Sequence, residues 1–202
     1  MTAPAAADEA RAYNAAVDRL RESYLARGQG AVERYARIML SSRSWPDGVQ
    51  LAWRLRYHPE LCQLDAECVL PGPEVVPLVR RYRYVAAVDA VRRQLIPPAE
   101  VRQRYAHFVA QAVLCALADL FHALAPAVVD VIQLNARVPV GAGAPPGAPR
   151  PYVVSIAAAR SEWAALHTDR DEPDTLLRQL DARISPDPYG RSPVQPWGDF
   201  DE

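Results

Sequence analysis

Arginine and tyrosine side chains are concentrated between residues 80 and 104. In this segment seven arginines stand against two acidic residues, and tyrosines lie among them. Arginine binds phosphate groups in a bidentate geometry, and both residue types are enriched in protein interfaces. The segment is therefore a candidate binding surface for nucleic acid or for a protein partner. Its candidate residues are Arg80, Arg81, Tyr82, Arg83, Tyr84, Arg92, Arg93, Arg102 and Arg104.

The opposite charge gathers at the C-terminal end of the chain. From residue 169 to residue 202, nine acidic residues stand against four arginines. Such a segment can dock on a basic segment of the same chain. Three alternatives therefore stay open for residues 80–104: contact with nucleic acid, with a protein partner, or with this chain's own tail.

Two carboxylates, Asp65 and Glu67, lie on the same side of a predicted strand. The expected order of helix, three strands, helix and strand is also that of the restriction-endonuclease-like nucleases. Those enzymes hold a divalent metal with an aspartate on the second strand and an acidic–x–Lys pair on the third. Here the third predicted strand offers only arginines, and all 23 basic residues of the chain are arginine. We therefore assign no catalytic residue and expect Asp65 and Glu67 to belong to a solvated face with Arg54; a rearranged metal site at the two carboxylates is the alternative.

Other residues that can carry chemistry do not form a known motif. His58, Cys62 and Cys68 lack the spacing of paired zinc ligands. The glycine-rich loop after Gly141 joins two strands, whereas a phosphate-binding loop leads into a helix. Ser155 lies inside a predicted strand and not on the sharp turn of a nucleophile elbow. We predict no cofactor and no metal.

Hydrophobic spacing predicts the elements that position these residues. A helical pattern with a glycine break opens the chain, and two strands follow as a hairpin. In the hairpin a turn at His58–Leu61 places Trp53 opposite Ala66 and Arg54 opposite Asp65, which satisfies both the apolar face and the charge pairing. The expected elements are helices over 8–42, 98–124 and 173–182 and strands over 49–57, 62–70, 75–85, 128–138 and 152–159.

Length and composition indicate one domain. The chain has 202 residues and a formal net charge of −1. No window approaches the roughly 18 consecutive apolar residues of a membrane span, and three cysteines do not suggest a disulfide scaffold, so we expect a cytoplasmic protein without a membrane partner. The expected boundaries are a disordered tail over 1–8, a single domain over 9–184 and a Pro-rich acidic tail over 185–202.

Four stretches carry a resemblance to a known family. The chain resembles actinobacterial proteins described as restriction-endonuclease-like, in which such a module precedes an Mrr-type nuclease domain that cuts DNA. The resemblance implies a DNA-associated or genome-defence setting, with the nuclease or effector on a separate chain because no nuclease half follows here. The stretches are Tyr35–Val49 (YARIMLSSRSWPDGV), Pro77–Val85 (PLVRRYRYV), Tyr105–Phe121 (YAHFVAQAVLCALADLF) and Leu180–Phe200 (LDARISPDPYGRSPVQPWGDF).

These observations predict a single α+β domain with a mixed sheet of about five strands, in the order α-βββ-α-ββ-α. We expect a restriction-endonuclease-like topology without its active site. The predicted function is a non-catalytic recognition or adaptor module that binds a partner protein or DNA. A divalent-metal-dependent nuclease with a rearranged site is one alternative, and a structural or dimerisation protein that forms a homo-oligomer is another.

Overall fold

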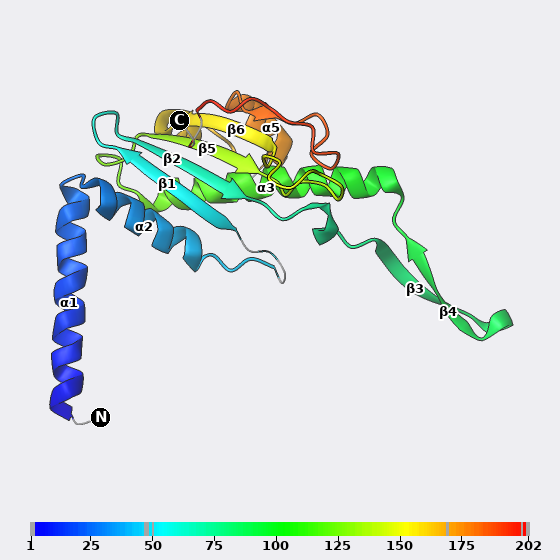
Figure 1. Ribbon diagram of the computed structural model, residues 1–202, viewed down its shortest axis with the longest axis horizontal. Helices are drawn as coiled ribbons and strands as arrows, with labels where there is room; N and C mark the ends of the chain where they lie inside the picture. Colours follow the sequence, from blue (N-terminus) through cyan, green and yellow to red (C-terminus); the bar gives the residue numbers. More distant parts are fainter. Residues whose placement is uncertain (1–2, 47–48, 50, 169, 199, 201–202) are drawn as a thin grey trace.

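A five-stranded sheet forms the centre of the computed structural model, which describes residues 3–46, 49, 51–168, 170–198 and 200. β2 and β5 run parallel and all other neighbouring strands run antiparallel, so the sheet is mixed (Figure 1). The predicted fold class, a single α+β domain with about five strands in a mixed sheet, is confirmed. In spatial order the strands are β1 (Ala52–His58), β2 (Gln63–Val69), β5 (Val131–Arg137), β6 (Tyr152–Ala159) and β7 (Arg183–Ile184).

The β1–β2 hairpin is present, but its register differs from the predicted one by two residues. Trp53 lies opposite Cys68 and Arg54 opposite Glu67. The connection lies one residue later in the chain than expected, at residues 59–62, because His58 pairs with Gln63 and Cys62 takes a left-handed backbone conformation (φ 49°). A shift of two residues keeps every side chain on its own face of the sheet, which is why the alternation in the sequence fits both registers.

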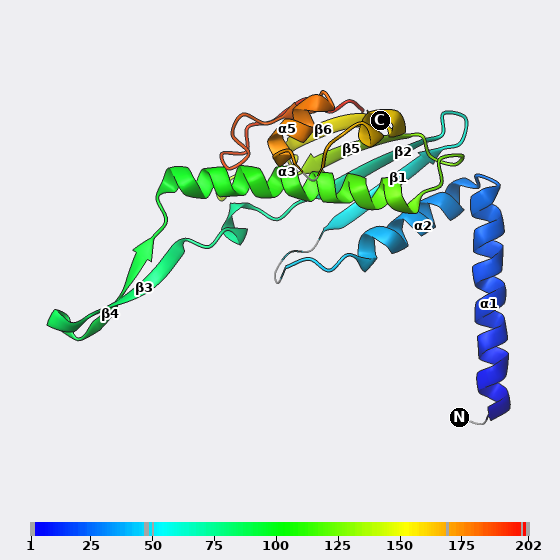
Figure 2. The same cartoon turned by 180° about the vertical axis from the view of Figure 1, so that it is seen from behind.

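The core lies between one face of this sheet and two helices, α2 (Gln29–Ser42) and α3 (Pro98–Ala123). Figure 2 shows α3 running along this face with α2 beside it. Leu64, Leu134 and Ile156 point from the sheet into the core, and Leu117 meets them from α3. The prediction that the long helix is the central buried element is confirmed.

Helix α3 is also, among the described residues, the one helix long and apolar enough to cross a membrane. Half of its most apolar window is buried inside the molecule. A helix at the centre of a protein core has the same length and composition, so this feature alone does not indicate a membrane.

Helix α1 (Ala3–Leu25) projects from the body at one end of the molecule (Figure 1). It begins inside the segment 1–8 that was expected to be a disordered tail, and that expectation is wrong from Ala3 onward. A bend at Arg27 and Gly28 separates it from α2, as the glycine break in the sequence predicts.

A second, two-stranded sheet projects from the opposite end of the molecule (Figure 1). It consists of β3 (Val79–Val85) and β4 (Ala90–Leu95), joined through the short 3-10 helix η2 (Ala86–Val88). The predicted strand 75–85 is thus shorter, because the 3-10 helix η1 (Pro73–Val75) precedes it, and it does not join the main sheet. Strand β4 was not predicted. In the main sheet β2 therefore neighbours β5 and not the third strand of the chain.

The C-terminal part returns to the body. Helices α4 (Arg160–Ala164) and α5 (Pro173–Gln179) lead into the short strand β7, where the sequence predicted a helix continuing to residue 182. The predicted Pro-rich tail then follows the second face of the main sheet as an extended segment. Residues 1–2, 47–48, 50, 169, 199 and 201–202, which include parts of both predicted tails, lie outside the described residues.

Candidate interaction surface

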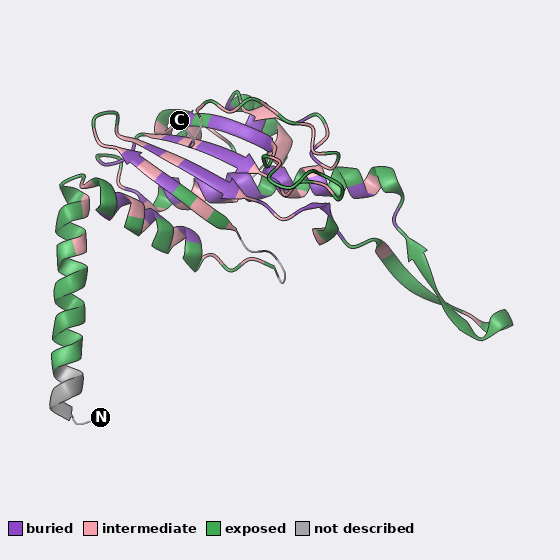
Figure 3. Cartoon of the chain, in the orientation of Figure 1, coloured by how far each residue is buried: buried purple, intermediate pink, exposed green. Residues whose placement is uncertain are grey.

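The β3–β4 hairpin holds most of the predicted binding residues on an arm that no described part of the chain covers. Every residue from Arg80 to Tyr84 and from Ala90 to Leu95 is exposed, and the arm is coloured as exposed over almost its whole length in Figure 3. A hydrogen bond from the Ile96 backbone N–H to the Leu78 carbonyl (2.9 Å) joins its two segments at the base, and the buried side chains of Ile96 and Val76 fix this base to the body. The arm is anchored at one end and free at the other.

One face of this ribbon is cationic. Side chains directly opposite each other in an antiparallel pair share a face, and Arg83 lies opposite Arg92. Arg81 lies on the same face opposite Gln94, and its Nε donates a hydrogen bond to Gln94 Oε1 (2.6 Å). Like charges facing each other destabilise a strand pair. The ribbon therefore concentrates uncompensated positive charge along one side.

The other face combines tyrosines with apolar side chains and one arginine. Tyr82 lies opposite Arg93 and Tyr84 opposite Val91. Tyr82 is 64% exposed although it is a large aromatic residue. The Tyr84 hydroxyl donates a hydrogen bond to Asp89 (2.6 Å), and this bond raises the pKa of Tyr84. Exposed aromatic residues beside an arginine are typical of a contact surface.

The remaining predicted residues lie at the base of the arm and in ion pairs. Arg80 and Arg104 both contact the Glu100 carboxylate, the latter at 2.9 Å. Arg102 contacts Asp187 at 3.4 Å and lies over the ring of Tyr189. The structure therefore divides the predicted set into an exposed group on the arm and a group bound to acidic or aromatic residues at the start of α3.

The same contacts show how much of the basic segment the acidic tail of this chain covers. The described contact between the two is Asp187 with Arg102. After Asp187 the tail turns away from the arm and crosses the main sheet, where Phe200 lies between Arg54 and Arg56. In the described part of the chain, self-docking is limited to the base of the arm and leaves its tip uncovered.

The two carboxylates considered as metal ligands are occupied by groups of this chain. Glu67 accepts hydrogen bonds from Arg137 (3.0 Å) and the Tyr152 hydroxyl (2.9 Å), and it is buried. Asp65 is bound by His58 Nε2 at 2.8 Å and Gln63 Nε2 at 2.7 Å. Among the described residues, no three His, Cys, Asp or Glu side chains come together as a metal site would need. The expected solvated face is wrong for Glu67, because this carboxylate is buried against Arg137 and Tyr152.

The residues considered for zinc binding or nucleophilic chemistry have structural surroundings. Cys68 is buried, and burial raises the pKa of its thiol, which keeps it protonated. His58 is bound to Asp65, and Cys62 contacts the Pro59 carbonyl. Ser155 is buried within the sheet, and its hydroxyl donates to Asn135 Oδ1 (2.6 Å). None of these contacts resembles an activated nucleophile or a ligand set.

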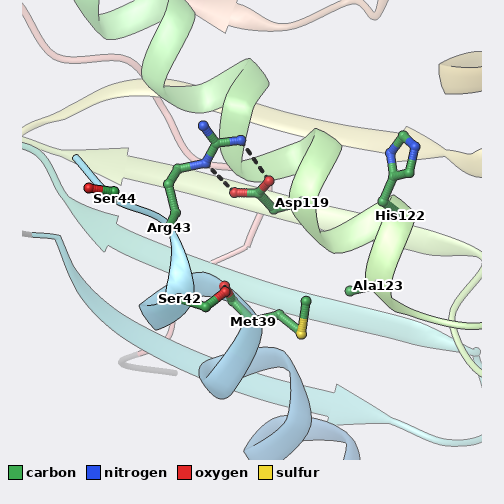
Figure 4. Close-up of a pocket in the computed structure, with 7 residues that line it drawn as sticks. All are labelled: Met39, Ser42, Arg43, Ser44, Asp119, His122 and Ala123. Carbon is green, nitrogen blue, oxygen red and sulfur yellow. Dashed lines mark hydrogen bonds and ion pairs between the residues drawn. The ribbon is translucent and has the colours of Figure 1, made fainter. Parts of the chain in front are cut away.

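A pocket of about 390 Å³ lies between the end of α2 and the end of α3. Arg43 donates two hydrogen bonds to the Asp119 carboxylate across it, one of them 2.6 Å long, and this interaction raises the pKa of Arg43. In Figure 4 the two side chains face each other, and His122 stands apart from them on α3. The ion pair compensates both charges within the chain, so we assign no ligand to this pocket.

The sequence reasoning missed a second polar surface, on the face of the main sheet opposite the helices. Arg54, Asn135, Ser155 and Arg183 lie there on four different strands. A signal was present, because polar residues alternate with apolar ones along β2 and β5. These residues could not be recognised as one surface without knowing which strands are neighbours in the sheet.

A comparison of this chain with known protein families, with curated proteins and with solved structures finds no match.

Proposed function

We propose that this chain is a non-catalytic binding module of a DNA-associated system, and that its β3–β4 arm contacts double-stranded nucleic acid. The observation that carries the proposal is the pair of arginines, Arg83 and Arg92, held directly opposite each other on an exposed ribbon. Each carries a full positive charge at neutral pH, because a guanidinium does not deprotonate in proteins. Two such charges side by side favour a ligand that brings negative charge between them.

Phosphate is the ligand chemistry that fits this face. Guanidinium groups bind phosphate oxygens through two parallel hydrogen bonds, and most protein–DNA hydrogen bonds go to the backbone of the nucleic acid. With Arg81 beside them, Arg83 and Arg92 place three guanidinium groups on one face of the ribbon. A phosphate backbone would relieve their repulsion and satisfy their hydrogen-bonding groups together.

The shape of the arm fits a groove. A two-stranded β-ribbon is narrow enough to enter the major groove of duplex DNA, and this ribbon stands free of the body on both faces. Tyr82, Tyr84 and Arg93 on the second face can then meet the edges of bases and the sugar–phosphate backbone, to which arginine and tyrosine side chains donate hydrogen bonds. An isolated two-stranded ribbon is only marginally stable in water, so a groove would also order the arm.

The setting of this activity comes from the resemblance described above. The resemblance to the restriction-endonuclease-like family implies genome defence in the bacterial cytoplasm, and we propose a nuclease or effector as the partner of this module. The four stretches that resemble the family are the support for this part of the proposal. It predicts that the chain recruits or positions an enzyme and does not cut DNA itself.

A salt-dependent binding measurement tests the proposal. Fluorescence anisotropy of a labelled 20-base-pair duplex is recorded with the wild-type chain and with the double variant Arg83→Ala/Arg92→Ala at several salt concentrations. We expect the wild type to lose affinity steeply with salt and the variant to lose about 0.9 of the logarithmic salt slope for each phosphate contact removed.

The matched control is Arg19→Ala/Arg21→Ala, which removes the same charge from exposed positions of α1. We expect it to bind the duplex almost as the wild type does. Failure of the wild type to bind at low salt would overturn the proposal, as would equal losses in the two double variants. Binding of a protein partner that depends on Tyr82 and Tyr84, without nucleic acid, would point to the protein-interface alternative.

A second candidate, assembly of several copies, is favoured by α1. This helix exposes Tyr13, Val17 and Leu25, whose spacing places the first two on one side. Such a stripe is typical of a helix that packs against a partner helix. Light scattering of the wild type beside Tyr13→Ala/Val17→Asp tests it: a dimer that dissociates in the variant supports assembly through α1, and a monomeric wild type contradicts it.

A further inference from the structure

The second face of the main sheet carries a row of polar side chains, one from each strand. The strand registers place Arg54, Glu67, Asn135, Ser155 and Arg183 next to one another across the sheet. Asn135 and Ser155, in the middle of the row, are both 0% exposed. Buried polar groups need hydrogen-bond partners, and a sheet face covered only for stability is normally apolar. The row therefore needs a polar occupant above it.

That occupant is the C-terminal segment of the chain, and the row contacts its backbone. The Trp197 N–H donates to Ser155 Oγ (2.9 Å), and Asn135 Nδ2 donates to the Gly198 carbonyl (2.8 Å). Arg183 Nη1 donates to the carbonyls of the two residues before Trp197, each at 3.2 Å. Because these bonds go to main-chain atoms, any extended peptide could make them.

One side chain of the segment is recognised individually. The Phe200 ring lies below two guanidinium groups, with Arg54 and Arg56 carbons 5.1 and 5.2 Å from its centre. Both arginines also donate to the Phe200 carbonyl, at 3.3 and 3.1 Å. Phe200 is buried, whereas Trp197 is 50% exposed and stacks on Arg183. The site therefore combines sequence-independent backbone contacts with one aromatic pocket.

This combination is typical of a peptide-binding surface. In such surfaces main-chain hydrogen bonds supply affinity, and a pocket for one side chain supplies specificity. The segment itself buries few of its side chains: among its described residues from Pro193 onward, Phe200 alone is buried. Segments with few buried apolar contacts open locally at low free-energy cost.

We infer that this face of the sheet is a binding site for an extended acidic peptide with one aromatic side chain, and that the C-terminal segment is its tethered occupant. Arg54, Arg56 and Arg183 favour carboxylates near the aromatic residue, and the segment itself has Asp199, Asp201 and Glu202 around Phe200. Tethering gives the segment a local concentration of the millimolar order, so a partner peptide competes only when the segment opens. The inference is independent of the nucleic-acid contact of the arm.

A labelled peptide tests this inference on the full-length chain. The probe is a fluorescein-labelled peptide with the sequence of residues 192–202, and its anisotropy is measured with the wild type and with Phe200→Ala. Removing the ring from the tethered segment leaves the binding site intact and raises the fraction of molecules in which the segment has left the site. We expect the variant to bind the probe at least about 10-fold more tightly than the wild type, because apparent affinity scales with the open fraction.

Two controls identify the site. Adding Arg56→Ala to the Phe200→Ala chain should weaken binding of the probe, since Arg56 lies in the aromatic pocket and is not part of the core. A probe with alanine in place of its own phenylalanine should bind weakly to every variant. Equal binding of both probes would overturn the role of the aromatic pocket.

Hydrogen exchange shows whether the segment has opened. The Trp197 amide should exchange faster in the Phe200→Ala chain than in the wild type, because its bond to Ser155 breaks when the segment leaves. An amide that stays protected would overturn the inference by making the segment a fixed part of the fold. The inference would also be overturned if hydrogen exchange shows that the segment opens and the opened chain still does not bind the probe.

Discussion

The two sheets of this molecule contain similar residue types but differ in what covers them. The five-stranded sheet is covered on one face by α2 and α3 and on the other by the chain's own C-terminal segment. The two-stranded sheet has neither cover, and its residues are exposed on both faces (Figure 3). A strand in the first sheet contributes to stability, whereas a strand in the second exposes its side chains to an external partner.

The largest difference between the two sheets concerns apolar side chains. Leu117 of α3, which packs against the main sheet, is 0% exposed, and Leu95 on the arm is 64% exposed. We expect Leu117→Ala to lower the free energy of unfolding by about 3 kcal/mol, since it leaves a cavity among packed neighbours. Leu95→Ala should change it by less than about 0.5 kcal/mol. Urea denaturation of both variants measures these two changes in the free energy of unfolding.

Comparable losses from the two leucine variants would mean that the arm is packed against the body in solution. In that case the arm would not be free to contact a partner.

The second difference concerns charge. Glu67 in the main sheet accepts hydrogen bonds from Arg137 and Tyr152 while buried. We expect Glu67→Gln, which keeps the volume and removes the charge, to cost about 2 kcal/mol, because hydrogen bonds to charged groups are stronger than neutral ones. Glu60→Gln at an exposed turn position should be neutral in the same urea titration. If both substitutions are neutral, the buried charge of Glu67 does not stabilise the main sheet through Arg137 and Tyr152.

The smallest expected effect is local to the arm. Arg92→Glu replaces a repelling cross-strand pair with an attracting one opposite Arg83. Such a pair contributes about 0.5 kcal/mol, which corresponds to roughly twofold slower hydrogen exchange of the arm amides. Global unfolding should stay unchanged, and binding of a duplex should weaken. Slower exchange without weaker duplex binding would separate the stability of the arm from its proposed ligand.

The comparison also shows what the sequence could predict. Alternating apolar residues in β1 and β2 and the long apolar run of α3 indicated the core correctly, because burial imposes a period on the sequence. Strand β4 was missed because a strand that nothing covers needs no alternation of apolar and polar residues. Its larger apolar residues, Val91 and Leu95, do not mark a buried face. Of the arm, the sequence predicted β3 as a strand, and the charge of the segment marked it as a candidate surface.

The C-terminal segment illustrates a different limit. Its contacts with Asn135, Ser155 and Arg183 join residues that are far apart in the chain. They depend on β5, β6 and β7 lying side by side, which no local pattern reveals. The β1–β2 register failed for the opposite reason, since two local solutions satisfied the same pattern.

The arm has one further consequence, which concerns solubility. A ribbon of two strands has two open edges, and each edge carries unpaired backbone groups that can pair with the same edge of another molecule. Arg83 and Arg92 on one face and Arg93 on the other give both faces of this ribbon positive charge. Mutual repulsion between arms therefore keeps molecules apart in solution. We expect the protein to become prone to strand-mediated aggregation when arginines of the arm are replaced by neutral β-formers.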